Sequence, residues 1–145
     1  MPTILGIPYP PNWLSWPPGM SPEDGLLFKK WRDCKLAGAV HLYFNVRVGA
    51  GRPCGIEVDD NIRKDWLYIT AKRIDLLIEY CDRWELVEFR SLANSNAIGR
   101  LLCYKMCYLE APPDDRPVKL VLVTNLYDAD VERLCHQFEI VYEVI

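Results

Sequence analysis

The clearest pattern in this chain is an alternation of apolar and polar residues near its middle. The alternating apolar positions are Ile74, Leu76, Ile78, Val87 and Phe89. A polar break at 82–83 divides the run into two short segments. Alternation with a period of two over adjacent segments predicts a β-hairpin with one buried face, so we expect strands over about 73–81 and 84–90.

A two-residue turn at 82–83 would set the register of this hairpin. In that register Asp75 lies directly opposite Arg90, and Glu88 lies diagonal to Asp75. Because side chains alternate along each strand, we expect Asp75, Glu88 and Arg90 on one face of the hairpin.

This combination of two carboxylates and a cation has a functional and a simpler interpretation. Carboxylate oxygens hold a hard cation such as Mg²⁺, and a positive group stabilises an attacking water or a scissile phosphate. Asp75, Glu88 and Arg90 would therefore suit a metal-dependent phosphodiesterase. The simpler interpretation is a cluster of surface salt bridges on one face of a hairpin.

The segments around the hairpin predict a fold of helices and strands. Ser21 and Pro22 are suited to begin the first helix. The expected elements are a helix at 21–35, a strand at 40–48, the hairpin, a helix at 94–110, a strand at 118–123, a helix at 128–138 and a strand at 140–144. The run at 118–123 is continuously apolar, as in a strand buried on both faces. We therefore expect one α/β domain over 21–145, a mixed central sheet flanked by helices in the order α-β-β-β-α-β-α-β.

The stretch at 49–65 is long for a connection inside a compact domain. Loops of that length are usually functional or contact-making. Its last part, 59–66, is compatible with a single helical turn. Its glycines lack the following Lys-Ser/Thr of a phosphate-binding loop.

Residues 1–20 combine prolines with large apolar side chains. Proline fixes φ and removes a backbone donor, so this stretch is expected to be neither a helix nor a central strand. It is too hydrophobic for a solvated tail, which indicates an extended arm that docks on a surface. That surface is either its own domain or a neighbouring subunit, and we expect the second. The apolar side chains available for the contact are Ile4, Leu5, Ile7, Tyr9, Trp13 and Trp16.

Charge and cysteine content narrow the functions open to the chain. The net charge of −3 and the pI of about 5.4 disfavour a general nucleic-acid binder. Without an apolar stretch of membrane length or a signal-like N-terminus, we expect a protein that is neither secreted nor membrane-bound. The six cysteines, among them Cys103, Cys107 and Cys135 beside His136, show no zinc spacing and predict reduced thiols without a structural metal.

Asp75 followed by Glu88-Phe-Arg90 resembles the signature of the PD-(D/E)XK nuclease-like superfamily, also called restriction-endonuclease-like. That signature is an acid on one strand and Glu-x-Lys on the next, and the first six expected elements match the superfamily's core order. The resemblance covers about residues 21–145. If the domain is active, it implies Asp75 and Glu88 as ligands of Mg²⁺.

Two arginines depart from the superfamily's pattern. Arg90 stands where the signature has lysine, and Arg100 stands where a glutamine is common in the following helix. Arginine stays protonated and is bulky, so ion pairing with the carboxylates would compete with Mg²⁺. A further acid can come from the first helix, where Glu23 is the match. These departures predict a degenerate site without a cofactor.

The length, the arm and the hairpin are similar to those of small proteins of this superfamily encoded among the structural genes of tailed bacteriophages. The resemblance implies a virion component near the neck or tail, such as an adaptor, assembled in the bacterial cytoplasm. Its partners would be other protein subunits bound through the arm, in a homo-oligomer. Two alternatives stay open: an active Mg²⁺-dependent nuclease acting on DNA, and a host-encoded accessory of DNA repair.

Overall fold

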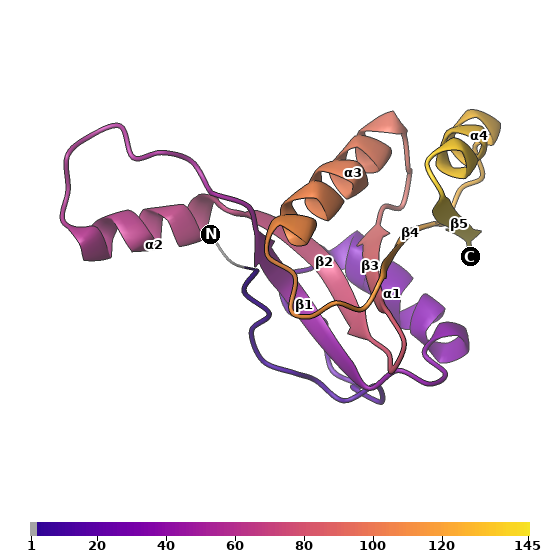
Figure 1. The fold of residues 1–145 in the computed structure, drawn as a ribbon. Coiled ribbons are helices and arrows are strands. Elements are labelled where there is room, and N and C mark those ends of the chain that lie inside the picture. The colour runs from indigo at the N-terminus through magenta and orange to yellow at the C-terminus, as the bar shows by residue number, and fades with distance from the viewer. Residues whose placement is uncertain (1–2) are drawn as a thin grey trace.

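Five strands form one mixed sheet in the computed structural model, which describes residues 3–145 (Figure 1). In chain order the elements are α1 (Pro22–Lys35), β1 (His41–Val48), α2 (Asp60–Thr70), β2 (Lys72–Glu79), β3 (Trp84–Phe89), α3 (Ser95–Glu110), β4 (Val118–Thr124), α4 (Ala129–Gln137) and β5 (Ile140–Val144). The strands lie side by side in sequence order; β1, β2 and β3 pair antiparallel, and β3, β4 and β5 pair parallel. The expected α/β class, with a mixed sheet flanked by helices, is confirmed. No helix in the described part of the chain is long and apolar enough to cross a membrane.

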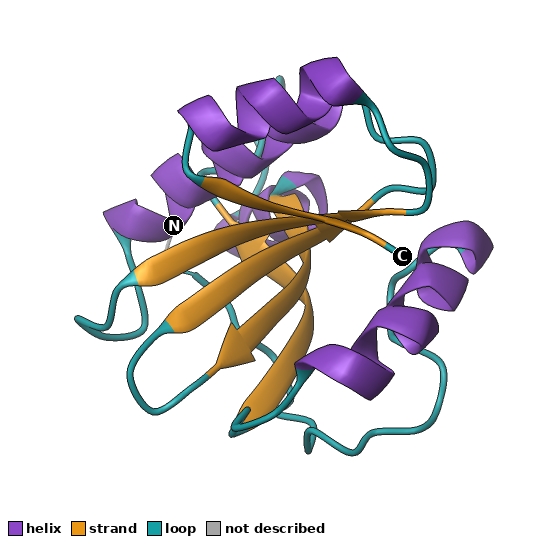
Figure 2. Ribbon diagram, turned by 90° about the vertical axis from the view of Figure 1, so that its right-hand side faces the viewer, coloured by secondary structure: helices purple, strands orange, loops and turns teal. Residues whose placement is uncertain are grey.

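Helices cover both faces of the sheet and enclose two separate cores (Figure 2). On one face α1 packs through Leu27, Phe28 and Trp31 against apolar side chains of β1 to β4. On the other face α3 and α4 pack together on the sheet, for example through Leu101 and Cys135. The central strand β3 is buried along its whole length, as expected for a strand between two covered faces.

The hairpin is present, but its turn lies one residue earlier than predicted. Glu79 pairs with Trp84, and a hydrogen bond from the Tyr80 N–H to the Arg83 carbonyl oxygen (2.9 Å) sets these two residues opposite each other. The turn is therefore centred on 81–82 instead of 82–83. The strands are therefore shifted by two positions from the predicted register.

The observed register changes which polar residues meet. Leu76 pairs with Val87, and one further step along the strands brings Asp75 level with Glu88. The prediction that Asp75 lies directly opposite Arg90 is therefore wrong. A shift by an even number of residues leaves each side chain on its original face, so the polar residues stay neighbours despite this error.

Both faces of the hairpin are buried, whereas one buried face was predicted. Leu76 packs in the core beneath α1, but Ile74, two residues earlier, packs in the core beneath α3. The pleat is therefore irregular at Asp75. The residue at the same level on β1, Asn45, has a positive φ of 54°, a backbone conformation that asparagine tolerates better than most residues. The sheet is thus distorted on two neighbouring strands at the level of Asp75.

Helix α2 is the element that the sequence analysis missed. A helical turn was expected at 59–66, but the helix runs to Thr70 and begins after the N-cap Asp59, whose side chain accepts a hydrogen bond from the Ile62 N–H (2.9 Å). The observed order is α-β-α-β-β-α-β-α-β, so the predicted order lacks one helix. Figure 1 shows α2 standing away from the sheet, and none of its residues is buried.

The arm lies along the outer edge of β1 in its own domain, which was the alternative to docking on a neighbouring subunit. Backbone hydrogen bonds join Ile4 to Arg47 and Tyr9 to Leu42, with N···O distances between 2.8 and 3.2 Å. The arm therefore covers a sheet edge that would otherwise be open to pairing. A contact with another chain stays a prediction, and the first two residues of the arm lie outside the described part of the chain.

The six apolar side chains of the arm divide into two groups. The half-buried ones are Ile4, Leu5, Tyr9 and Trp13. Ile7 and Trp16 are exposed, by 69% and 41%. The indole of Trp16 lies on α1 at Gly25, where an added Cβ would come within 2.2 Å of the ring. Glycine at this helical position thus permits the close approach of the arm.

Candidate functional site

Strands β2 and β3 separate at the end of the hairpin away from its turn, and the residues at this fork are polar. The regular pairing of the two strands stops at Leu76 and Val87. Beyond that point Oδ2 of Asp75 accepts a hydrogen bond from the Phe89 N–H (3.1 Å). The Asp75 carboxylate thus takes the place of a backbone acceptor and is held between the two strands.

Arg90 joins carboxylates from two different elements at this fork. Its Nη2 lies 3.0 Å from Oε1 of Glu88, and its Nη1 lies 3.2 Å from Oδ2 of Asp24 on α1. The side chain of Glu88 is only 1% exposed, and that of Asp24 11%. The structure therefore brings together the predicted residues Asp75, Glu88 and Arg90 and adds Asp24. These four residues are termed the fork cluster.

Burial dominates the protonation of the fork cluster. Burial and then the charge of Asp75 raise the pKa of Glu88 to about 8, against the opposing charges of Arg90 and Arg100. The pKa of Asp75 is also raised, mainly by burial, although the hydrogen bond from Phe89 and the charge of Arg90 lower it. Oε2 of Glu88 is buried and has no hydrogen-bond partner among the described residues. The raised pKa of Glu88 means that burial and the nearby charge of Asp75 outweigh the favourable contact with Arg90.

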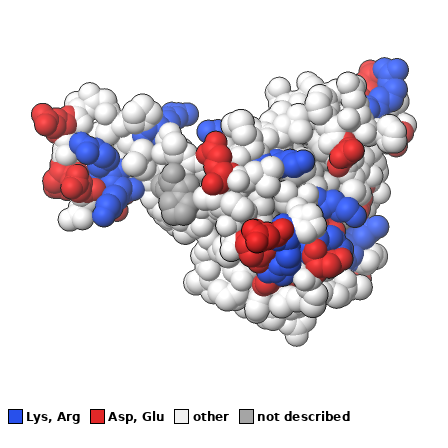
Figure 3. Space-filling view, viewed as in Figure 1, with Lys and Arg blue, Asp and Glu red and all other residues white. Residues whose placement is uncertain are grey.

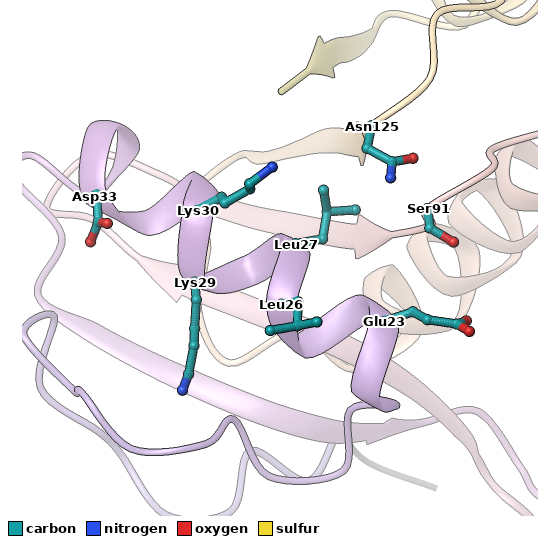
Figure 4. A pocket seen from close by; sticks show the side chains of 8 residues that line it. All are labelled: Glu23, Leu26, Leu27, Lys29, Lys30, Asp33, Ser91 and Asn125. Carbon is teal, nitrogen blue, oxygen red and sulfur yellow. The ribbon is translucent and has the colours of Figure 1, made fainter.

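The acid that the first helix supplies is Asp24 and not the predicted Glu23. Asp24 is buried because it shares one face of α1 with Leu27, Phe28 and Trp31, at spacings of three, four and seven residues. Glu23 is exposed, and Figure 4 shows its carboxylate directed away from α1 at the rim of a pocket. A shift by one position turns a helical side chain far enough to leave the buried face.

Two residues that line this pocket are sequence neighbours of fork-cluster residues. Its volume is about 570 Å³, and it lies between α1 and the ends of β3 and β4. Glu23 and Ser91, which line it, are the sequence neighbours of Asp24 and Arg90 (Figure 4). Its lining contains both lysines and acids, so the charge of the pocket does not favour an anionic ligand.

Two residues of α3, Arg100 and Tyr104, interact electrostatically with Glu88 of the fork cluster. Arg100 is exposed and lowers the pKa of Glu88 through its charge, and it makes no ion pair among the described residues. Tyr104, one helical turn later, is buried; burial and the charge of Glu88 raise the pKa of its phenol to about 12. The sequence analysis named Arg100 but not Tyr104, although a spacing of four residues places both on one face of a helix.

The carboxylates of the fork cluster do not fit a hydrated Mg²⁺ in this arrangement. Magnesium requires ionised and accessible oxygen ligands. Arg90 holds one oxygen of Glu88 and one of Asp24, a backbone N–H holds one oxygen of Asp75, and the side chain of Glu88 is only 1% exposed. Within residues 3–145, no group of three or more histidine, cysteine, aspartate or glutamate side chains is placed to hold a metal ion. No metal-dependent step follows from this geometry.

A second charged cluster lies at the other end of the same strands, beside the hairpin turn. Nη2 of Arg116 lies 2.8 Å from Oε2 of Glu79, and its Nε lies 3.1 Å and 3.0 Å from the two carboxylate oxygens of Asp114. The guanidinium also lies over the ring of Trp84, at 4.8 Å from the centroid. His41 completes the set, because its Nδ1 lies 2.9 Å from Oε1 of Glu79. Glu79, Asp114 and Arg116 are termed the turn cluster.

The pKa values of the two acids in the turn cluster are shifted in the opposite direction to those of Asp75 and Glu88. Burial acts to raise the pKa of Glu79, but hydrogen bonds from Arg116 and His41 outweigh it and lower the pKa. Hydrogen bonds from the Arg116 side chain hold the pKa of Asp114 well below its usual range. Both carboxylates of this cluster are therefore ionised at neutral pH.

Charges of both signs are also interleaved over the wider surface. Figure 3 shows acidic and basic side chains mixed on the face seen in Figure 1, without a broad basic area. This distribution agrees with the net charge of −3. The face seen in Figure 3 does not supply the positive surface that general nucleic-acid binders use to neutralise phosphates.

Comparison with known proteins gives no match for this chain, whether with family models, curated proteins or solved structures. The function is therefore argued from the residues of the site itself.

Proposed function

We propose that this protein has a catalytically degenerate PD-(D/E)XK nuclease-like domain and acts as a structural subunit in the neck, tail or adaptor region of a tailed-phage virion. Support for the fold comes from the connection of the elements: α1, the antiparallel strands β1 to β3, and the crossover through α3 to β4, which is parallel to β3. This order follows the core implied by the resemblance, with α2 inserted between β1 and β2. Further support is that Asp75 and Glu88 lie on adjacent strands, with Arg90 two residues after Glu88.

The observation that carries the degenerate interpretation is the contact of Arg90 with two carboxyl groups. A lysine at this position would be a compact point charge, whereas the planar guanidinium contacts both groups at once. Arg90 therefore occupies an oxygen of Glu88 and an oxygen of Asp24, and a metal ion would have to compete with it for them.

Cleavage assays on DNA and RNA with Mg²⁺ and with Mn²⁺ test the degenerate interpretation. Wild-type protein is expected to cut no faster than Glu88→Ala or Asp75→Ala. Glu79→Ala is the matched control, since it removes a carboxylate from the other end of the same hairpin. A metal-dependent cleavage that Glu88→Ala abolishes and Glu79→Ala retains would overturn the proposal and establish the alternative, an active Mg²⁺-dependent nuclease.

The structural assignment is supported by apolar surface that the domain leaves uncovered. On the arm, Ile7 and Leu14 are exposed by 69% and 74%, although the rest of the arm is bound to the edge of β1. Apolar groups exposed in this way are typical of surfaces that contact another protein. The arm would then present its outer side to a neighbouring subunit while its inner side stays on its own domain.

Mass spectrometry of purified particles tests the assembly function. With the gene expressed in its native genetic context, the protein is expected in the particles at a fixed ratio to known virion subunits. The double variant Ile7→Ser/Leu14→Ser is expected to fold normally but to be depleted from particles. Detection of the wild-type protein only in the soluble cell fraction would contradict the proposal.

A further inference from the structure

Helix α2 carries an apolar stripe that faces away from its own domain. Ile62, Trp66 and Ile69 are separated by four and three residues, so their side chains lie on one face of the helix. Their exposed fractions are 52%, 43% and 59%. Figure 1 shows the helix standing away from the body of the molecule. Three large apolar side chains on an exposed helical face are typical of helix-mediated recognition.

The opposite face of α2 attaches the helix to the domain. Tyr68 lies beneath the guanidinium of Arg47 on β1, with Cζ 4.3 Å from the ring centroid. The backbone at Gly51 approaches the helix so closely that an added Cβ would lie 2.4 Å from the carbonyl oxygen of Leu67. These contacts involve Leu67 and Tyr68, which lie on the other side of the helix from the stripe. The stripe is therefore not needed to hold α2 in place.

We propose that α2 pairs with the same helix of a second copy of this chain, in an antiparallel arrangement with a two-fold axis at Trp66. Ile62 and Ile69 lie at similar distances on either side of Trp66, so each would pack near the other residue of the partner helix. Such a pairing is isologous and closes as a dimer. This proposal rests on the proposed structural function and names one partner of the subunit, a second copy of the same chain.

The charges at the two ends of α2 select this orientation. Asp59 and Asp60 lie at its N-terminal end, and Lys72 and Arg73, the first residues of β2, follow its C-terminal end after Ala71; all four are exposed. An antiparallel pair therefore brings the acidic end of each helix towards the basic start of β2 in the partner. A parallel pair would set like charges and like ends of the helix dipoles together.

A lipid surface is the competing occupant for an amphipathic helix with an exposed tryptophan. Helices that lie in membrane interfaces carry a basic polar face that attracts anionic lipids. Here Arg63 and Lys64 are balanced by Asp60 and Asp65. The polar side of α2 therefore has no positive surplus, and a protein partner is favoured.

Light scattering on size-separated full-length protein tests the pairing. Wild type is expected to be a dimer that dissociates on dilution, and Trp66→Ala is expected to weaken dimerisation at least tenfold with an unchanged circular dichroism spectrum. Tyr127→Ala is the matched control, because Tyr127 is an aromatic side chain exposed by 56% outside α2. A wild-type monomer at every concentration, or equal dimerisation of Trp66→Ala, would overturn the proposal.

A charge exchange tests the antiparallel orientation. Asp60→Lys and Lys72→Glu are each expected to weaken the homodimer, since each places like charges together. Mixed in equal amounts, the two variants are expected to form a heterodimer of wild-type affinity, because both contacts again join opposite charges. Failure of the mixture to associate would refute the orientation.

A flotation assay separates the lipid alternative from self-association. Wild-type protein is expected not to float with vesicles of phosphatidylglycerol and phosphatidylcholine. Flotation that Trp66→Ala abolishes would replace the second copy by a lipid surface as the partner of α2. Neither outcome changes the particle analysis, so failure of the pairing can be told apart from failure of the proposed function.

Discussion

The two ends of the β2–β3 hairpin hold acidic side chains in opposite states. In the turn cluster, Arg116 and His41 supply donors to two partly exposed carboxylates, whose pKa values are lowered. In the fork cluster, Arg90 alone contacts the more deeply buried Asp24 and Glu88, and the pKa of Glu88 is raised to about 8. Both clusters combine aspartate, glutamate and arginine, and each includes one acid from β2, Asp75 or Glu79. The balance between burial and available donors therefore decides which acids stay ionised.

The comparison separates a structural cluster from a candidate site. At the turn, Arg116 donates to Asp114, Glu79 and the Tyr80 carbonyl oxygen, and so fastens the segment before β4 to the hairpin. At the fork, a buried carboxyl oxygen of Glu88 lacks a partner. Buried polar groups are usually satisfied, and a buried acid with a strongly shifted pKa is a candidate functional residue.

The largest expected effect follows from removing the arginine of the fork. Arg90→Met keeps most of the apolar stem but leaves Glu88 and Asp24 without their cation. We expect a loss of about 3 kcal/mol in the free energy of unfolding at pH 8, because Asp24 loses its cation and Glu88, about half ionised near its pKa of 8, loses the same partner. At pH 5, where Glu88 is protonated, we expect a smaller loss of about 2 kcal/mol, because only the contact with Asp24 still involves a buried charge pair. Chemical denaturation at the two pH values measures the difference.

Arg116→Met is the matched control at the turn. Its two acids are ionised at both pH 5 and pH 8, so its effect on stability is expected to be the same at both. An equal pH response of the two variants would show that the clusters do not differ in the way described.

A second prediction concerns the proton on Glu88. Its folded-state pKa of about 8 lies above the ordinary value of 4.5, so the folded state binds this proton more tightly. Below pH 4.5 both states are protonated; as the pH rises towards 8, this group lowers stability by up to about 1.4 kcal/mol per pH unit. Glu88→Gln cannot ionise, so it should stabilise the protein by about 2 kcal/mol at pH 8 and flatten the pH dependence.

Glu79→Gln should instead destabilise the protein at neutral pH. The pKa of Glu79 is lowered, so its contribution to stability is present above the unfolded-state pKa and is lost as the pH falls through the folded-state pKa. We expect a loss of about 1 kcal/mol at pH 7 and a smaller loss at pH 3. Thermal denaturation of both variants over this pH range provides the test, and a stabilising Glu79→Gln would contradict the comparison.

The smallest expected effect tests whether the arm packs on α1 next to Asp24 of the fork cluster. Gly25 follows Asp24 and lies beneath the ring of Trp16, where a Cβ would clash at 2.2 Å. Gly25→Ala is expected to destabilise the protein by about 1 kcal/mol, because this overpacking outweighs the better helix propensity of alanine. Gly99→Ala on α3, where an added Cβ meets nothing within 4 Å, should stabilise by about 1 kcal/mol. Equal stabilisation by both substitutions would show that the arm does not rest on α1.

The apolar pattern was sufficient to group the fork residues but not to place them in register. Alternation with a period of two fixes which side chains share a face, whereas the position of the turn depends on local hydrogen bonds such as that between Tyr80 and Arg83. The distortion at Asn45 and Asp75 has no signature in an alternating sequence. The two-residue error in register was therefore outside what the pattern determines.

Helical periodicity contained more information than the prediction used. Asp24 occupies a position of the apolar stripe of α1, and an acid at such a position is a direct sign of a buried carboxylate. The stripe of α2, from Ile62 to Ile69, has helical spacing, but only a single helical turn over 59–66 is predicted there, at the end of a long loop. A helix that buries nothing in its own domain lacks the packing that normally supports such an assignment.

Carbon-13 NMR titration of the glutamate side-chain carboxyl groups tests the central contrast most directly. The resonance of Glu88, assigned by its loss in Glu88→Gln, is expected to titrate near pH 8, while that of Glu79 is expected to titrate below 4.5. Titration of both groups near 4.5 would mean that the fork cluster is an ordinary set of surface ion pairs and would contradict the account given for the site.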